Sequence, residues 1–329
     1  MSKLTLPSVA FMICSEKGML EKKSVLFAKS LRKFGGTLKD SPIYSLAPRK
    51  GKNISANTLE LFNKLNVSHH YEHLNDKYET YAFANKIITC AYFEKQLEED
   101  ILIFCDSDQL VLGNLDELIL AKEDIAMQHV ALKGIGTNGK DENANYWEEL
   151  YRLTHVKKQS YITLSNSEKI LQYYNAGLIA AKRKLGLFEK WNKNFGLVMQ
   201  NQLKPTKGDF FLEQSVLSAT IAAMELSVKV LPNGYNYHLL KETNITEAFT
   251  KIEYGEINLL HYHTNFEHPI QLKIPKGVPI SKDNSILNWI NDKLMDCGIN
   301  DRLFLTESES TFNLKKKELQ ALFDKKTNT

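Results

Sequence analysis

The 329-residue chain contains 42 basic and 39 acidic residues, a formal charge of +3 that is too balanced to indicate a nucleic-acid-binding surface. Hydrophobic residues make up 43% of the sequence, as in ordinary globular proteins, and the length suits one large α/β domain or two smaller ones. The four cysteines, Cys14, Cys90, Cys105 and Cys297, form no CxxC pair, which argues against a disulfide framework or a zinc site and favours a reducing compartment.

Secretion and membrane insertion are also disfavoured by the sequence. The apolar run near the N-terminus covers only residues 9–14, which is too short for the core of a signal peptide. No stretch has the length that a transmembrane helix needs. We therefore expect a soluble, cytoplasmic protein.

Strand-like and helix-like segments alternate over the first hundred residues. In the first helical segment, Phe27, Leu31 and Phe34 recur at the spacing of one helix face, and Gly35-Gly36 provides the stop. This alternation predicts an α/β protein with a mixed, mostly parallel central sheet flanked by helices. The predicted strands are 9–14, 42–46, 67–73 and 101–105, and the predicted helices are 19–36, 54–66 and 78–100.

The rest of the chain has fewer regular segments. The Gly/Asn-rich stretch 134–147 is predicted to be a loop or a lid. Residues 173–184 and 257–260 are apolar runs that predict further strands. Nothing in the middle resembles a linker, so we expect one large domain over 1–280 and a helical C-terminal extension over 281–329 that packs on it or trails from it.

The stretch 98–118, EEDILIFCDSDQLVLGNLDEL, raises the main functional question. A buried strand ends in Asp106 and Asp108, two carboxylates that repel each other and lose hydration unless something compensates. A divalent cation is the simplest compensation. In open α/β sheets, ligands bind beyond the carboxyl ends of the strands, where both aspartates lie. Taken alone, apolar residues followed by DxD are also typical of acidic residues that only end a strand.

Three other stretches support a site at this position. Lys86 lies off the apolar stripe of its predicted helix, where a lysine is ordinarily solvated. Asn175-Ala176-Gly177 interrupts an apolar run, and a glycine there suggests the close approach of another backbone or a ligand. His261 ends the strand 257–260 and completes a mixed oxygen and nitrogen set that suits Mn²⁺ better than Ca²⁺ or structural zinc. We expect His263, two residues on, to contribute less.

The order of these segments resembles that of a known family. The strand with DSD and LVLGNLDEL is followed by YYNAGLIAAKR, FFLEQSVL, LPNGYNYH and LLHYH. From Val9 to His263 this order is similar to that of the GT-A nucleotide-sugar transferases, closest to the glycogenin-like, family 8 type. The resemblance implies a Rossmann-like GT-A fold and transfer of a sugar from a nucleotide-diphosphate sugar, with a UDP-sugar expected as donor.

The resemblance also implies roles for individual residues. In that family the DxD aspartates and a late histidine bind Mn²⁺ (or Mg²⁺), which holds the donor diphosphate, and a lysine upstream of DxD meets the phosphates. An Asn-Ala/Ser-Gly segment touches the donor sugar, and Asp-Gln stands where this chain has Glu213-Gln214. The expected residues are Asp106, Asp108 and His261 for the metal, Lys86, Asn175, Glu213 and Gln214 for catalysis, and Cys14, Ser15, Lys86, Asp106, Ser107, Asp108, Asn175, Ala176 and Gly177 for the donor.

Alternatives to this assignment differ in the chemistry they need. Haloacid-dehalogenase phosphatases carry DxD on their first strand with Thr or Val next, whereas here DxD comes late and Gln109 follows. A metal-dependent nucleotidyltransferase uses a related sheet and likewise binds its metal through two carboxylates. A degenerate transferase that binds nucleotide sugars or a glycan without turnover is the non-enzyme alternative. The sequence after His268 departs from the family's ending, so the acceptor, whether carbohydrate, glycolipid or protein, is not implied.

Overall fold

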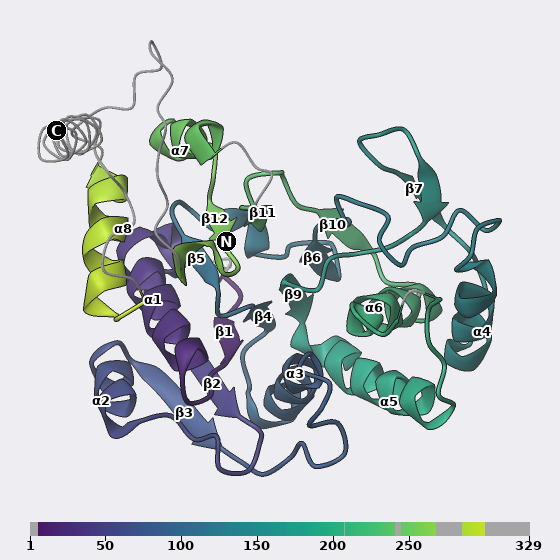
Figure 1. Ribbon diagram of the computed structural model, residues 1–329, viewed down its shortest axis with the longest axis horizontal. Helices are drawn as coiled ribbons and strands as arrows, with labels where there is room; N and C mark the ends of the chain where they lie inside the picture. Colours follow the sequence, from purple (N-terminus) through teal and green to yellow (C-terminus); the bar gives the residue numbers. More distant parts are fainter. Residues whose placement is uncertain (1–5, 207, 241–244, 268–284, 300–329) are drawn as a thin grey trace, which may run out of the picture.

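The computed structural model describes residues 6–206, 208–240, 245–267 and 285–299, and a seven-stranded sheet lies at its centre (Figure 1). Its strands are β1 (Val9–Cys14), β2 (Ile43–Ala47), β3 (Val67–Tyr71), β4 (Ile101–Cys105), β6 (Ile125–Met127), β9 (Leu178–Lys182) and β10 (Val228–Val230). They lie in the order β10-β6-β9-β4-β1-β2-β3. The pairs among β1 to β4 are parallel, whereas β9 runs antiparallel to both β4 and β6.

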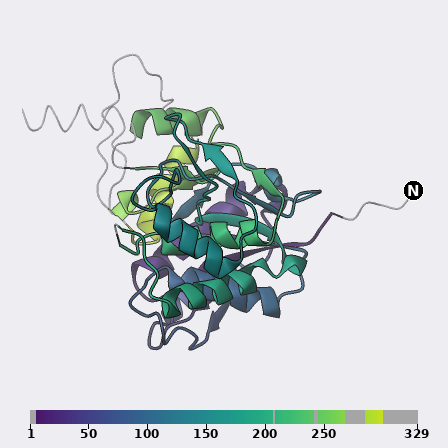
Figure 2. The ribbon, with the colours of Figure 1, turned by 90° about the vertical axis from the view of Figure 1, so that its right-hand side faces the viewer.

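Helices cover both faces of this sheet. One face packs against α1 (Met19–Phe34), α2 (Ala56–Lys64), α7 (Ile245–Glu253) and α8 (Ser285–Asp296). The other packs against α3 (Ala84–Gln96), α4 (Ala144–Thr154), α5 (Leu187–Gln200) and α6 (Leu212–Ala223). This second layer faces the viewer in Figure 2.

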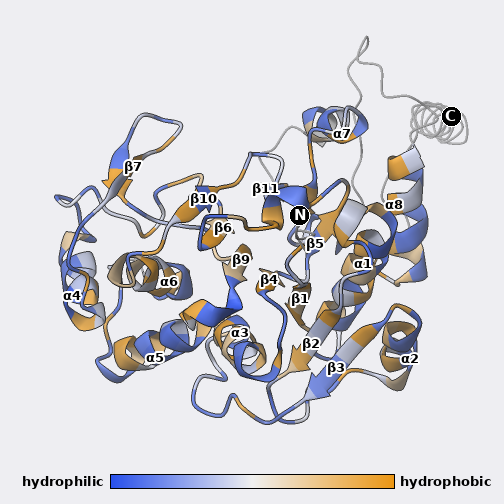
Figure 3. Ribbon diagram, turned by 180° about the vertical axis from the view of Figure 1, so that it is seen from behind, coloured by the Kyte–Doolittle hydropathy of each residue, from blue (hydrophilic) through white to orange (hydrophobic). Residues whose placement is uncertain are grey.

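Strand β1 shows why the sequence needs both layers. All six of its residues are buried, so neither side of the strand meets solvent. Phe11 and Ile13 join the core that contains α1, whereas Met12 and Cys14 join the core that contains α3. A strand buried on both faces is a continuous apolar run rather than an alternating one. The hydrophobic colouring of β1, β2 and β4 in Figure 3 follows this pattern.

A smaller sheet brings distant parts of the chain together. Its strands are β5 (Gln109–Val111), β11 (Tyr237–His238) and β12 (Leu259–His261), while β7 (Tyr161–Thr163) and β8 (Lys169–Leu171) form a separate hairpin. Strand β12 runs antiparallel to β5, so that His261 pairs with Gln109. Because β5 begins directly after the two aspartates, this pairing places His261 beside them.

The predicted fold class is confirmed, because the mostly parallel sheet lies between two helical layers. The predicted strands 9–14, 42–46 and 101–105 agree with β1, β2 and β4 within one residue, and the third predicted strand ends at Tyr71. The first helix ends at Phe34, as the glycine pair predicts. Gly36 has a φ of +59°, a backbone conformation that residues with a Cβ rarely adopt.

Two predicted segments differ from the structure. The helix expected over 78–100 begins only at Ala84, because the residues before it form turns, and one of these turns is fixed by the Asn75 side chain accepting from the backbone N–H of Tyr78. The loop expected over 134–147 loses its last four residues to α4. There the indole N–H of Trp147 donates to the Ile135 carbonyl at 2.8 Å, and this helix face is buried.

Within the expected C-terminal extension, α8 packs on α1. The rings of Phe34 and Trp289 meet edge to face with centroids 5.0 Å apart, and Lys22 donates to the carbonyl of Gly298 at 2.8 Å. The proposed boundary at residue 280 and the segment 300–329 lie outside the described residues. The division of the chain into 1–280 and 281–329 therefore stays a prediction.

Helix lengths bear on the expectation about membranes. The longest α-helix among the described residues, α1, has 16 residues, whereas a membrane span needs about 20. In the described part of the chain, no helix combines the length and the apolar character that crossing a bilayer requires. The cytoplasmic location stays a prediction.

Glu94 joins α3 to the start of α5 and provides a test of this packing. Its buried carboxylate accepts from the backbone N–H groups of Phe188 and Glu189 at 3.1 and 2.7 Å. Glu94→Ala leaves both groups without this acceptor, so we expect a loss of about 2 kcal/mol in the free energy of unfolding, measured by urea denaturation. Glu98→Ala, an exposed position nearby, is the control, and equal losses in both variants would contradict this role.

Candidate functional site

A cavity of about 740 Å³ lies where β1 and β4 end, a volume typical of small-molecule sites. Two of the predicted site residues, Ser15 and Ala176, are fully buried and do not line it. The other predicted residues all do: Cys14, Lys86, Asp106, Ser107, Asp108, Asn175, Gly177, Glu213, Gln214 and His261.

Lys86 is buried on α3, with 7% of its surface exposed. Its ammonium group lies 2.9 and 3.0 Å from the two carboxylate oxygens of Asp106 and 4.0 Å from Oε1 of Glu213. Burial lowers the pKa of Lys86, but these two carboxylates outweigh burial and hold the pKa above its ordinary value. The default of a solvated lysine does not hold for Lys86, because paired charges rather than water compensate this amine.

Glu213 anchors the far side of this lysine. Its carboxylate is 1% exposed and accepts from the hydroxyl of Tyr81 at 2.5 Å. Burial raises the pKa of Glu213 in spite of the neighbouring Lys86. The indole N–H of Trp191 donates to the Glu213 carbonyl at 3.0 Å, which fixes the first turn of α6.

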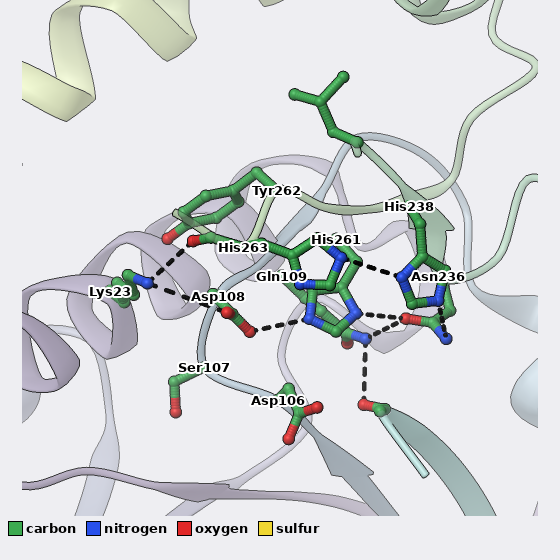
Figure 4. A network of polar contacts seen from close by, with 12 residues as sticks. Lys23, Asp106, Ser107, Asp108, Gln109, Asn236, His238, His261, Tyr262 and His263 are labelled. Carbon is green, nitrogen blue, oxygen red and sulfur yellow. Dashed lines mark hydrogen bonds and ion pairs between the residues drawn. The ribbon is translucent and has the colours of Figure 1, made fainter. Parts of the chain in front are cut away.

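Asp108 has different cationic partners from Asp106 (Figure 4). Its Oδ1 lies 3.0 Å from Nε2 of His261, and its Oδ2 lies 3.9 Å from the ammonium group of Lys23 on α1. Burial raises the pKa of Asp108, but the charge and hydrogen bond of His261 together with the charge of Lys23 outweigh burial and hold the pKa below its ordinary value. Burial raises the pKa of Asp106 in spite of Lys86. The repulsion between the two carboxylates is thus relieved by separate protein cations.

Asn236 sets the protonation of His261 through a chain of hydrogen bonds. The side-chain amide nitrogen of Gln109 donates to the Gly177 carbonyl at 3.0 Å and to Oδ1 of Asn236 at 2.7 Å. The same Oδ1 lies 2.9 Å from Nδ1 of His261. Because an amide oxygen only accepts, Nδ1 of His261 carries a proton, so Nε2, which faces Asp108, is the ring nitrogen that a cation can reach.

This arrangement fits a divalent cation. Nε2 of His261 and Oδ1 of Asp108 face each other at 3.0 Å, a contact that holds a proton and whose place a cation could take. One ligand atom from each of Asp106, Asp108 and His261 falls within 4.8 Å of the others. Carboxylate oxygens with one imidazole, itself oriented by an amide, form a donor set that Mn²⁺ or Mg²⁺ accepts.

The segment Asn175-Ala176-Gly177 lies directly against the first aspartate. The backbone N–H of Asp106 donates to the Gly177 carbonyl at 2.9 Å. A Cβ on Gly177 would lie 3.2 Å from Oδ2 of Asp106 and 3.0 Å from Oδ1 of Asn175, so the close approach that its glycine predicts is present. Gln214 accepts from the buried N–H of Ala176 at 2.9 Å and so holds the segment in place.

Of the residues expected to bind the donor, Cys14 lines the cavity but Ser15 does not. Burial raises the pKa of the Cys14 thiol to about 12, so the sulfur is neutral. Ser107 donates to the Cys14 carbonyl and joins β1 to the DSD turn. Ser15 is fully buried, and its backbone N–H donates to the Leu46 carbonyl at 3.0 Å. A contact between Ser15 and a base would need this strand end to move.

Two further histidines lie beside His261. The ring centroids of His263 and His261 are 4.0 Å apart, and Nδ1 of His238 lies 3.0 Å from Nε2 of His263. Burial and the neighbouring imidazoles lower the pKa of His238 to about 3 and that of His263 to about 4, so both rings are neutral at neutral pH. His263 was expected to point elsewhere, but a φ of +53° after the end of β12 turns it into the cavity.

Several residues in or beside the cavity carry no sequence signal of their own. Lys23 is one of several lysines on α1, and its ammonium group lies 2.7 Å from Oε1 of Glu267 and 3.9 Å from Oδ2 of Asp108. Arg49 and Glu16 form a pair in the cavity wall, with Nε of Arg49 3.0 Å from each carboxylate oxygen. Asn236 lies in LPNGYNYH, a segment noted in the sequence, although its individual role appears only once its four side-chain contacts are seen.

Comparison with solved structures identifies two similar glycosyltransferases. An apo structure of the bifunctional glycosyltransferase WbbM is 13% identical, with a TM-score of 0.41, over 80% of this chain and 47% of that one. This chain thus spans about half the length of WbbM. Apo mouse xyloside xylosyltransferase 1 is 12% identical, with a TM-score of 0.46, over 79% of this chain and 98% of that one. No curated protein matches the sequence.

Comparison with protein families gives a match over most of the chain. The model of the Rhodobacterales glycosyltransferase domain matches residues 11–225. The matched region contains both aspartates, Lys86 and the segment Asn175-Ala176-Gly177, while His261 lies beyond it. The chain therefore belongs to the Rhodobacterales glycosyltransferase family.

Proposed function

We propose that this glycosyltransferase is a metal-dependent enzyme of the GT-A, family 8 type that moves a hexose from a UDP-sugar to an acceptor hydroxyl. The observation that supports this most directly is the convergence of two carboxylates and one imidazole nitrogen in a single cavity. Asp106, Asp108 and His261 would hold Mn²⁺ or Mg²⁺ against the donor diphosphate.

The transfer breaks the bond between the anomeric carbon and the phosphate oxygen, and the acceptor oxygen forms the new bond as its hydroxyl proton departs. The cation, when bound, stabilises the charge on the diphosphate that leaves. Lys86 supplies a fixed positive charge on the same side, because its ammonium group is locked between Asp106 and Glu213. Because the ammonium group is already in place, the site needs little reorganisation as negative charge develops on the leaving group.

Apolar side chains in the cavity wall would limit hydrolysis of the donor. Water that reaches the anomeric carbon competes with the acceptor, so transferases exclude it. The segment Asn175-Ala176-Gly177 would contact the donor sugar between these walls and the metal, with Gln214 holding its backbone. The apolar lining comprises Leu20, Phe83, Phe104, Val130, Leu132, Tyr173, Phe210, Phe211, Leu239 and Leu240.

A thermal-shift screen of nucleotide sugars with and without Mn²⁺ tests this proposal. A ligand that binds only the folded protein raises its melting temperature by mass action. We expect UDP-sugars to raise it in a Mn²⁺-dependent manner. Shifts with nucleoside triphosphates alone would favour a nucleotidyltransferase, and donor binding without sugar transfer to any acceptor would favour a degenerate binding protein.

Asp108→Asn should abolish Mn²⁺-dependent donor binding in that screen. The sequence alone suggests that removing one of two repelling carboxylates is neutral or stabilising, but the structure pairs Asp108 with His261 and Lys23. We therefore expect the apo protein to lose about 1 kcal/mol in its free energy of unfolding as well. The exposed Asp292→Asn on α8 is the control. Unchanged Mn²⁺ affinity in Asp108→Asn would remove the metal-site assignment.

Lys86→Met should lower both stability and donor affinity. Removing the lysine leaves the buried carboxylates of Asp106 and Glu213 without their cation, and breaking such a pair costs about 3–5 kcal/mol. Adding Glu213→Gln should recover part of the stability measured by urea denaturation without recovering donor affinity. Lys95→Met, exposed on the same helix, is the control. Full recovery of donor affinity in the double variant would make Lys86 purely structural.

Asn236 variants separate the two ends of its side chain. Asn236→Asp keeps an oxygen opposite Nδ1 of His261 but removes the N–H that donates to Oδ1 of Asn175 at 2.9 Å. The Mn²⁺ affinity should stay within about threefold of the wild-type value. The ratio of UDP-sugar affinity to UDP affinity should fall about tenfold. Asn236→Ala should weaken both. The His261 tautomer, read from ¹⁵N NMR shifts, should stay Nδ1–H only in the aspartate variant; a shift to Nε2–H there would refute this assignment.

A further inference from the structure

Three imidazoles meet at the edge of the small sheet, which is more than one Asp-Asp-His set requires. His238 ends β11, His261 ends β12 and His263 follows it. Their ring centroids lie 4.0, 4.8 and 5.1 Å apart, and one nitrogen from each ring falls within 4.8 Å of the others. Figure 4 shows the three rings close together, with His261 joined to Asp108 and His238 next to Asn236. We propose that these histidines bind a late first-row transition ion, Zn²⁺ in class, at a site that shares His261 with the aspartates.

The spacing of the ring nitrogens suits one ion. Nδ1 of His238 and Nε2 of His263 are 3.0 Å apart. Two imidazole nitrogens at about 2.1 Å from a tetrahedral zinc lie about 3.4 Å apart. The two nitrogens must therefore separate by about 0.4 Å, and both rings must turn so that their lone pairs point at the ion rather than at each other. The third nitrogen is Nε2 of His261, because Asn236 already holds the proton on Nδ1. Three protein ligands leave the fourth position of the ion for water or a ligand.

The proton between His238 and His263 has a place to go when an ion binds. Asn236 donates to Nε2 of His238 at 3.3 Å, which leaves the proton of this ring on Nδ1, facing His263. An ion that takes both facing nitrogens moves this proton to Nε2 of His238. The contact that must then be given up is the longest that the Asn236 side chain makes, and no proton leaves the ring.

The two cation sites should prefer different metal ions, because their ligand atoms differ. Imidazole nitrogens favour Co²⁺, Ni²⁺, Cu²⁺ and Zn²⁺, whereas Mg²⁺ and Mn²⁺ prefer carboxylate oxygens. The sites exclude each other, because Nε2 of His261 cannot serve an ion at the three histidines and an ion at Asp106 and Asp108 together. An ion at the histidines therefore opposes donor binding, if the donor site works as proposed above. This makes the histidine cluster a point at which Zn²⁺ would inhibit the enzyme.

Co²⁺ is a direct probe, because tetrahedral Co²⁺ has strong visible absorption that does not depend on activity. We expect the full-length protein to bind Co²⁺ with this absorption and Zn²⁺ to displace it. His263→Asn and His238→Ala should each lower Zn²⁺ affinity at least tenfold in competition with a chromophoric chelator. Asparagine suits position 263, because it tolerates the positive φ there. His70→Ala is the control, since that histidine lies on β3 outside the cavity.

Asp106→Asn separates this inference from the proposed function. It should retain the Co²⁺ absorption and Zn²⁺ affinity while losing Mn²⁺-dependent UDP binding. Absence of tetrahedral Co²⁺ absorption in the wild type, or equal Zn²⁺ affinity in wild type, His238→Ala and His263→Asn, would overturn the histidine site and leave the donor site untouched. If the wild type shows no Mn²⁺-dependent UDP binding, only the donor site is overturned. Melting temperatures of all variants identify any that fail to fold.

Discussion

The site depends on how the protein compensates two carboxylates at the end of one buried strand. Lys86 on α3 neutralises Asp106. Asp108 is instead neutralised by His261 on β12 and Lys23 on α1. These three cations come from both helical layers and from the small sheet. The cavity can therefore form only when the whole α/β sandwich is assembled. A divalent ion that binds here would therefore compete with cations that the fold already supplies.

Much of this architecture is readable from local sequence. Continuous apolar runs identify β1 and β4, because both faces of these strands are buried, and helical periodicity identifies α1. The DSD turn and His261 are found for the same reason, since each follows an apolar strand and so must lie at an end of a sheet. In each case the sequence pattern and the burial that produces it lie within a few residues of each other.

The contacts that sequence reasoning could not give depend on pairings across long distances. Periodicity alone places Lys86 on a solvated face, because its partners Asp106 and Glu213 lie 20 and 127 residues further along the chain. Asn236 gives no local signal, because its function is to join Gln109, Asn175 and two histidines that meet only in the folded protein. Turn geometry fails similarly for His263, whose positive φ overrides strand alternation.

Family membership and the three clustered histidines rest on different parts of the chain. The match to the Rhodobacterales glycosyltransferase domain ends at residue 225, so it contains the aspartates and Lys86 but none of the three clustered histidines. Those histidines are positioned by β11 and β12, and β12 pairs with β5, which lies inside the matched region. The family part thus provides the strand beside which the histidines assemble without specifying them. Changes in the segment after residue 225 can alter the imidazole set while the carboxylates and their lysine stay unchanged.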